Sequence, residues 1–530
     1  MALTQSQMKR LTAVHGWSGT ILGLLLFVVV STGTLAVFSP EIERWSVGVS
    51  APKTLDAPID GIVRNLADKM PNAMREEVGI WRDARGNLVA FFHTHIPHPE
   101  SGKTEDYGTL FHIDPATGAV LDRAEGFVWT EPSLWVRSAL EYFLVHLHVE
   151  LFLPDPWGLV ATGILGLLMM AAALTGGLMH RHLIRDLFVA ERPGGRLASV
   201  RDRHVLAATW GLPFAVILAF TGSYYSFAGT VTRPLLAEVA YAGDQDRLRA
   251  SLFQPTAAED ARRAPPADLD RMIARATEEG GTAPTFLSIT NYGRADSRAH
   301  VWHPAAPGRL SWGSMVFETA TGTFLGPKPT IGNTPSAGST LVGLIWPLHT
   351  GDFAGLASKA VWGALGGAMC FVILSGLRLW VRRRDADPLW RAFGRAVLAT
   401  GCGVPLAMVA CAHVFFLAQP FGTAAALTWT PAGFFAAALG CLALAWRMAD
   451  VGRLRRLYLA LFAYGCLLLP AVRLACGGTS WANALAQGHG VVVAVDGLLL
   501  AAGAAALARH RGWVGRWSRH SRTEKMEPAE

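Results

Sequence analysis

Two stretches of the chain decide the fold. They are residues 15–33, HGWSGTILGLLLFVVVSTG, and residues 204–222, HVLAATWGLPFAVILAFTG. Each begins with His, continues as an apolar run and ends in Thr-Gly, with the same spacing from the His to the last Gly. Runs of this length are about what a helix needs to cross a bilayer core of about 30 Å. The pattern predicts two membrane helices that carry a His at the same point.

A second pattern also occurs twice. Leu147-His148 and Leu348-His349 each stand shortly before an apolar run, and these runs contain Thr175-Gly176 and Ser375-Gly376 near their ends. The two patterns together predict an internal duplication, in which the order helix, external segment, helix is repeated over residues 1–385.

Composition supports a protein that crosses the membrane many times. Hydrophobic residues make up 51% of the 530 residues and charged residues 16%. We predict eight transmembrane helices, at about 16–38, 157–179, 205–228, 356–381, 396–418, 431–447, 457–475 and 489–508. Arg-rich loops such as Arg382–Arg384 and Arg453–Arg456 fall on the side that holds both termini, and the positive-inside rule makes that side cytoplasmic. The net charge of +7 is explained by this topology, so no nucleic-acid partner is expected.

Two long segments, about 39–155 and 229–355, are then periplasmic in a bacterial inner membrane. Each predicts a small α+β domain. The first has a helix at 59–70 and strands at 77–81 and 88–95, and the second has a helix at 269–277 and strands at 285–290 and 299–303. The predicted fold class is therefore an α-helical polytopic membrane protein with two periplasmic α+β domains. Its parts are a first repeat (1–200), a second repeat (201–385) and a four-helix membrane bundle with a basic tail (386–530).

Paired histidines at membrane boundaries indicate bound haem. His15 and His204 start their helices on the cytoplasmic side, and a small residue, Gly19 or Ala208, follows four positions later on the same helical face. A porphyrin that lies against a helix needs such a gap. His148 and His349 predict a second haem at the periplasmic boundary. The chain has no CxxCH motif, so we expect about two non-covalent b-type haems with His axial ligands.

Other histidines remain open as ligands. His180 and His146 are alternatives to the four residues above, and His413 and His489 could hold a third haem in the added bundle. A single interfacial His is more often satisfied by water or lipid phosphate.

A separate pair, His93 and His95, shares one face of a predicted strand. We interpret this pair as strand-end residues.

The His…Thr-Gly helix, the Leu-His entry to the second helix and the Asp114-Pro115-x-Thr117-Gly118 turn resemble PepSY-associated transmembrane proteins. That family includes inner-membrane ferrisiderophore reductases of the FoxB type, which are similar in carrying two b-type haems. The resemblance implies PepSY-like periplasmic domains and a reductase of ferric siderophores, with the four paired histidines as haem ligands. Reduction releases iron because oxygen donors that suit Fe³⁺ hold Fe²⁺ less well.

The electron donor and the functional class stay open. No G-x-G-x-x-G follows a predicted strand, so electrons come from quinol or from a separate reductase, and Asp496 with Arg473 could belong to a quinol site in the lipid-embedded bundle. Another periplasmic acceptor would fit the histidines equally well. A non-redox PepSY sensor, a protease-regulating membrane scaffold and a transporter are the alternatives.

Overall fold

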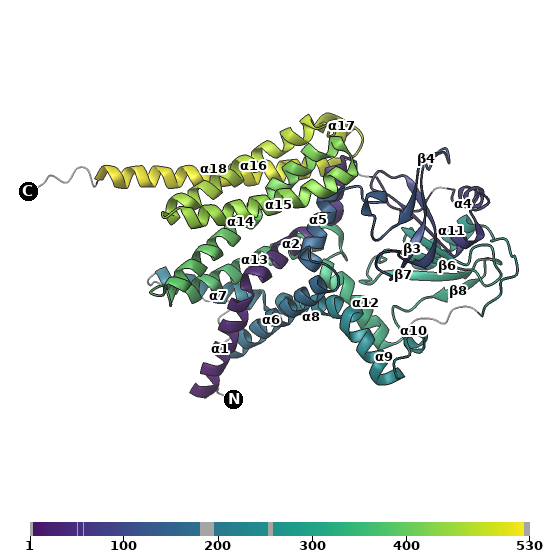
Figure 1. Ribbon diagram of the computed structural model, residues 1–530, viewed down its shortest axis with the longest axis horizontal. Coiled ribbons are helices and arrows are strands. Elements are labelled where there is room, and N and C mark those ends of the chain that lie inside the picture. The colour runs from purple at the N-terminus through teal and green to yellow at the C-terminus, as the bar shows by residue number, and fades with distance from the viewer. Residues whose placement is uncertain (1–3, 50, 57, 181–195, 253–257, 524–530) are drawn as a thin grey trace, which may run out of the picture. The chain divides into compact units, whose positions relative to one another are not determined.

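A computed structural model describes residues 4–49, 51–56, 58–180, 196–252 and 258–523. The chain forms two compact units, and we describe each by itself (Figure 1). Residues 1–48, 138–230 and 356–530 form the helical unit, and residues 49–137 and 231–355 form the sheet unit. Both units are therefore built from segments that are distant in the sequence.

Seven helices of the described chain are long and apolar enough to cross a membrane, and a bent helix pair raises the number to eight. The protein is thus a multi-pass membrane protein, as predicted. The long helices of the helical unit are α6 (Trp157–Met179), α8 (Leu212–Phe227), α13 (Gly355–Arg382), α14 (Pro388–Ala418), α15 (Thr423–Arg447), α16 (Val451–Ala475) and α18 (Gly490–Thr523). Of these, α14, α15, α16 and α18 lie together as one bundle (Figure 1).

The first and third predicted spans are interrupted helices. The first consists of α1 (Gln5–Ile21) and α2 (Gly23–Ala36), which meet at Leu22 with a bend of 68°. The third begins with α7 (Arg196–Trp210) and continues as α8 after Gly211, with Pro213 in the first turn of α8. Gly and Pro have low helix propensity, and Pro cannot donate to the preceding turn, which explains these positions.

Two short helices that the sequence assigned to the external segments belong to the helical unit. They are α3 (Ser39–Val47) and α5 (Ala139–Glu150). Phe143 of α5 is buried and its ring contacts Phe434 and Phe435 of α15. Most apolar side chains of α5 are buried, because exposing so many of them to water would be unfavourable. Both helices therefore belong to the helical unit, although the predicted external segment 39–155 contains them.

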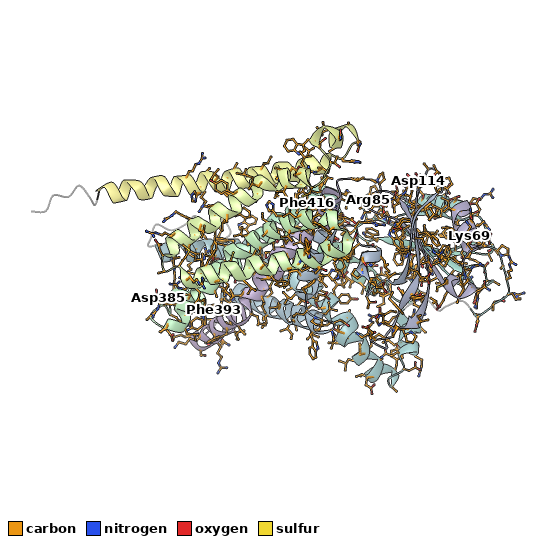
Figure 2. All side chains as sticks on the ribbon, turned by 45° about the horizontal axis from the view of Figure 1, so that its top comes forward. Lys69, Arg85, Asp114, Asp385, Phe393 and Phe416 are labelled. Atoms are coloured by element: carbon orange, nitrogen blue, oxygen red, sulfur yellow. The ribbon has the colours of Figure 1, made fainter. Side chains whose placement is uncertain are left out.

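A buried ion pair joins the late helices to α3. Asp496 of α18 accepts hydrogen bonds from Arg473 of α16 at 2.7 Å, from Trp45 of α3 at 2.8 Å and from Trp481 of α17 (Trp481–Ala486) at 2.8 Å. Both charged side chains are at most 2% exposed. Trp45 also packs edge-on against Phe416, which Figure 2 labels within the helical unit. The carboxylate thus has partners from three helices.

One antiparallel sheet of eight strands forms the centre of the sheet unit, in the order β4-β3-β2-β1-β5-β6-β7-β8. The first segment supplies β1 (Glu77–Arg82), β2 (Leu88–Pro97), β3 (Thr104–Ile113) and β4 (Val120–Phe127). The second supplies β5 (Phe286–Thr290), β6 (Arg298–His303), β7 (Gly313–Glu318) and β8 (Phe324–Pro327). The strands predicted from sequence are confirmed within one or two residues.

The two segments are not two separate domains, because β1 pairs directly with β5. Helices α4 (Asp60–Ala67) and α11 (Leu269–Gly280) pack on one sheet face and share a single apolar core (Figure 1). Their N-termini are capped reciprocally. The Asp270 carboxylate accepts from the backbone N–H of Ile59 at 2.7 Å, and the Asp60 carboxylate accepts from that of Leu269 at 3.1 Å. The expectation of two independent α+β domains is corrected to one shared sheet.

The remaining helices of the sheet unit are short. They are α9 (Arg233–Tyr241), α10 (Gln245–Leu252) and α12 (Ala337–Thr350). The predicted Thr-Gly turns are present, with Gly118 at φ 70° and Gly322 at φ 75°, a backbone conformation that favours glycine. Asp114 at the start of the first of these turns is labelled in Figure 2.

We predict that Asp496→Ala lowers the stability of the protein by about 3–5 kcal/mol, because it leaves the Arg473 charge buried without a partner. Thermal unfolding in detergent measures the effect. The control is Asp450→Ala, which removes an exposed N-cap of α16 and should cost much less stability than Asp496→Ala. The double variant Arg473→Met/Asp496→Leu should recover part of the loss. Equal stability of the two single variants would contradict this role of the ion pair.

Candidate functional site

His15 of α1 lies against the end of α6. Its Nδ1 is 2.9 Å from the backbone oxygen of Ala172. The ring passes over Gly176, where an added Cβ would come within 3.1 Å of the His15 Cε1. A carbonyl oxygen can only accept, so Nδ1 carries the proton of the neutral ring and Nε2 keeps its lone pair.

His204 of α7 makes the same contact with α13. Its Nδ1 is 3.1 Å from the backbone oxygen of Val372 and 2.9 Å from the Ser375 hydroxyl. Its Cε1 would be 3.2 Å from a Cβ at Gly376. In both cases the bound carbonyl stands four residues before the glycine under the ring. The same tautomer is therefore selected at His15 and His204.

The two rings face each other across a short gap within the helical unit. Their centres are 6.4 Å apart and their planes are 74° apart. Two imidazoles on opposite sides of one metal, with bonds of about 2.0 Å and about 1.1 Å more to each ring centre, would have centres about 6.2 Å apart. The observed separation of 6.4 Å is close to this value.

The surroundings also fit a flat macrocycle. A Cβ added at Gly19, four residues after His15, would meet no atom within 4 Å. Gly16, three residues before Gly19, leaves room for Trp380, whose ring lies 5.3 Å from that of Trp17. The donor set, the tautomer and the open space at Gly19 all suit haem with two His ligands.

His148 of α5 repeats the arrangement on α2. Its Nδ1 is 2.9 Å from the backbone oxygen of Val29, and a Cβ at Gly33 would lie only 2.6 Å from its Cε1. His146 differs, because its Nδ1 turns back to the Tyr142 oxygen of its own helix at 2.8 Å. The structure thus separates these two neighbours and favours His148 as the oriented imidazole.

The other candidate histidines are placed differently. His349 is in the last turn of α12, in the sheet unit, and its pairing with His148 stays a prediction from the sequence. His180 is the C-cap residue of α6. His413 of α14 has its Nε2 2.9 Å from the Gly465 oxygen of α16, and His489 directly precedes α18. The structure brings together His15 and His204.

The sequence analysis did not predict the structural role of the glycines under the imidazoles. It recorded Gly33, Gly176 and Gly376 as parts of a repeated pattern, whereas the structure shows that each makes room for an imidazole. The partner carbonyls could not be read from side-chain identities. The signal that was available is the [Ser/Thr]-Gly pair near the end of each run.

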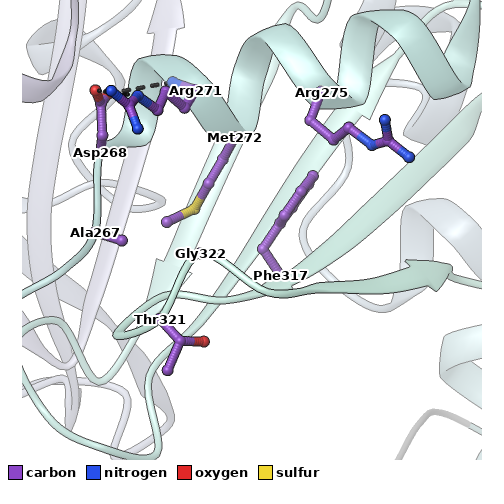
Figure 3. A pocket seen from close by; sticks show the side chains of 8 residues that line it. All are labelled: Ala267, Asp268, Arg271, Met272, Arg275, Phe317, Thr321 and Gly322. Atoms are coloured by element: carbon purple, nitrogen blue, oxygen red, sulfur yellow. Dashed lines mark hydrogen bonds and ion pairs between the residues drawn. The ribbon is translucent and has the colours of Figure 1, made fainter.

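A hollow beside α11 in the sheet unit offers no comparable chemistry. It is lined by Asp268, Arg271, Arg275 and Phe317 among others (Figure 3). Asp268 caps its own helix and pairs with Arg271, and Arg275 pairs with Glu279. Its charged side chains are thus already partnered locally, and we assign it no function.

Comparison with known proteins identifies the family to which the chain belongs. A protein of Pseudomonas aeruginosa strain PAO1, described as uncharacterized, is 31% identical over 258 residues, which is 46% of this chain and 64% of that protein. The chain thus spans less than two thirds of the length of this curated relative. Residues 12–383 match the model of the PepSY-associated TM region. This match covers more than half of the chain, which therefore belongs to the PepSY-associated TM region family.

Proposed function

We propose that this protein is a haem-containing reductase of the bacterial inner membrane, which passes electrons to a periplasmic acceptor. The observation that carries the proposal is the pair His15 and His204, two oriented imidazoles with centres 6.4 Å apart and both Nδ1 atoms held by backbone carbonyls. A sensor or scaffold has no need for two imidazoles that face each other in this way.

We also infer the internal duplication. The helix breaks at Leu22 and Gly211 both fall seven residues after the paired histidines. A second correspondence supports it: Gly166 of α6 packs against Ser223 of α8, and Gly366 of α13 packs against Thr34 of α2. By this duplication His349 is the counterpart of His148, and these two residues are the proposed ligands of a second haem.

Each residue has a definite task in this proposal. The carbonyl of Ala172 or Val372 fixes the ring orientation and the proton position of its histidine, and the glycine below the ring lets the helices approach. Haem held by two histidines supplies reversible one-electron transfer with no open coordination position. Apolar helices around the site exclude water and lower the local dielectric.

The two sites lie toward opposite ends of the first span. His15 and Gly33, the latter under His148, are separated by 18 residues, or about 27 Å of helix path before the bend is considered. The Arg-rich loops place the His15 end at the cytoplasmic face in this proposal. Electrons from the cytoplasmic side or from quinol then reach a periplasmic acceptor, for which the family resemblance favours Fe³⁺ in a siderophore.

We propose that the donor site does not include Asp496. Each of its two carboxylate oxygens accepts two hydrogen bonds, two in all from Arg473 and one each from Trp45 and Trp481, so the four acceptor positions are occupied within the protein. Arg473 is likewise committed to this carboxylate and to the Thr479 oxygen. We therefore propose a separate reductase, or quinol bound elsewhere, as the donor.

We expect about two b-type haems per chain, measured as pyridine haemochrome. His15→Ala and His204→Ala should each remove the same haem, and His148→Ala and His349→Ala should each remove the other. The matched control is His146→Ala, which should keep full haem content because its ring contacts its own helix. Colourless wild-type protein would overturn the redox proposal and leave a PepSY scaffold or sensor. Full haem content in His15→Ala and His204→Ala would refute the ligand assignment.

Bulk at Gly19 should exclude haem without unfolding the protein. Gly19→Leu meets no protein atom within 4 Å of its Cβ, so we expect normal expression and a loss of the haem near His15. Gly440→Leu in α15 is the control, because a Cβ there also meets no atom within 4 Å and α15 itself contains no histidine. Absorbance at the Soret band per mole of protein is the measurement. Equal haem content in both variants would show that the porphyrin does not lie against this face.

The acceptor is tested with dithionite-reduced protein. If a ferric siderophore is the substrate, its addition should re-oxidise the haem. One Fe²⁺ should then appear in a ferrozine trap for each haem that is re-oxidised. His148→Ala, which interrupts the path near the proposed periplasmic end, should slow re-oxidation. Copper(II) and oxidised periplasmic redox proteins are the comparison acceptors. Haem that stays reduced with every ferric chelate would exclude iron as the acceptor.

A further inference from the structure

The sheet unit carries a cluster of metal-ligand side chains that the haem proposal does not use. Within the described part of the chain, Glu77, His93 and His95 have ligand atoms that all lie within 4.8 Å of one another. Glu77 of β1 stands directly opposite His93 of β2, and His95 shares the face of His93 two residues further along the strand. The cluster therefore follows from strand register.

One carboxylate oxygen is aimed at both imidazoles. Glu77 Oε2 is 3.9 Å from His93 Nε2 and 3.8 Å from His95 Nε2. Its other oxygen accepts a hydrogen bond from the Ser288 hydroxyl of β5 at 2.6 Å, which fixes the carboxylate. Ligands of one tetrahedral ion with bonds of about 2.1 Å lie about 3.4 Å apart, so small side-chain movements would close the site.

The two rings are oriented by groups behind them. His93 stacks on Phe91 with ring centres 4.2 Å apart and planes 9° apart. His95 Nδ1 is 3.0 Å from a carboxylate oxygen of Glu76, which holds the proton on that nitrogen and directs Nε2 toward Glu77. A carboxylate behind a ligating imidazole is the usual support of a metal-bound histidine.

The site has room and access. Opposite His93 on β3 stands Gly108, where a Cβ would come within 2.6 Å of the His93 Cβ, so the residue paired with His93 on that strand places no side chain beside it. Asp106 Oδ1 is 3.3 Å from His95 Nε2 and offers a fourth oxygen. Side-chain exposure is 29% for Glu77 and 38% for His95, against 7% for His93. An ion can therefore reach the site from solvent.

We propose that Glu77, His93 and His95 bind a divalent first-row transition metal ion, with Asp106 as a further ligand. Two imidazoles and a carboxylate suit Zn²⁺, Fe²⁺ or Co²⁺, whereas Ca²⁺ and Mg²⁺ require oxygen ligands. Both histidines were interpreted from the sequence as strand-end residues, because the opposing Glu77 could not be placed without the register. This site is independent of the haem ligands.

Equilibrium dialysis of the full-length protein against Zn²⁺, with elemental analysis of bound zinc, tests the proposal. We expect one Zn²⁺ per chain and a loss of affinity of at least about tenfold in Glu77→Gln and His95→Ala. Glu77→Gln preserves size, so it guards against misfolding. The control is His98→Ala, whose ring contacts Phe127 outside the cluster and whose removal should leave zinc binding unchanged.

Zinc binding and haem content are independent measurements on these variants. Haem content should be the same in wild type, Glu77→Gln and His98→Ala, whichever way the redox proposal is decided. Equal zinc binding by wild type and Glu77→Gln would overturn the proposed site. Displacement of the zinc by excess Mg²⁺ or Ca²⁺ would also overturn it, since that would indicate a non-selective acidic surface. Fe²⁺ under anaerobic conditions should compete with Zn²⁺ at the wild-type site.

Discussion

The helical unit depends on one repeated contact, in which an imidazole from one helix donates Nδ1–H to a backbone carbonyl of another and lies over a glycine. It occurs at His15 on α6, at His204 on α13 and at His148 on α2. The carbonyl four residues before the glycine is the acceptor each time. A helix carbonyl already accepts one bond from its own helix and has a second lone pair to offer, so the contact leaves both helices intact.

This contact links packing to chemistry. A larger residue at Gly33, Gly176 or Gly376 would push the imidazole away from its carbonyl, and the tautomer would no longer be defined. The same glycine that permits close approach of the helices therefore prepares Nε2 as a ligand atom. Helices α16, α17 and α18 are held to α3 by other contacts, the hydrogen bonds of the buried Asp496 carboxylate with its three partners. These buried polar groups are satisfied, as a water-excluding interior requires.

The sheet unit shows how separate segments become one structure. Pairing of β1 with β5 joins the two halves into a single sheet, and the crossed capping of α4 and α11 ties their N-termini. The same β1 strand aligns Glu77 with His93 on one side and places Glu77 beside Ser288 on the other. A candidate metal site thus uses strands from both segments, although all its ligands come from the first.

The sequence by itself determined the membrane spans, the helices α4 and α11 and the strands β1, β2, β5 and β6, because hydropathy and periodicity are local properties of the chain. It also predicted that His15 pairs with His204, whose rings the structure brings together. Tertiary structure decided what local patterns do not encode. It decided that α3 and α5 pack in the helical unit, that the two external segments share one sheet, and that Asp496 is saturated by Arg473 and two tryptophans. It also decided that His146 turns away while His148 reaches Val29. Such choices depend on which backbone atoms and strand neighbours meet in space, and only the packed chain fixes those distances.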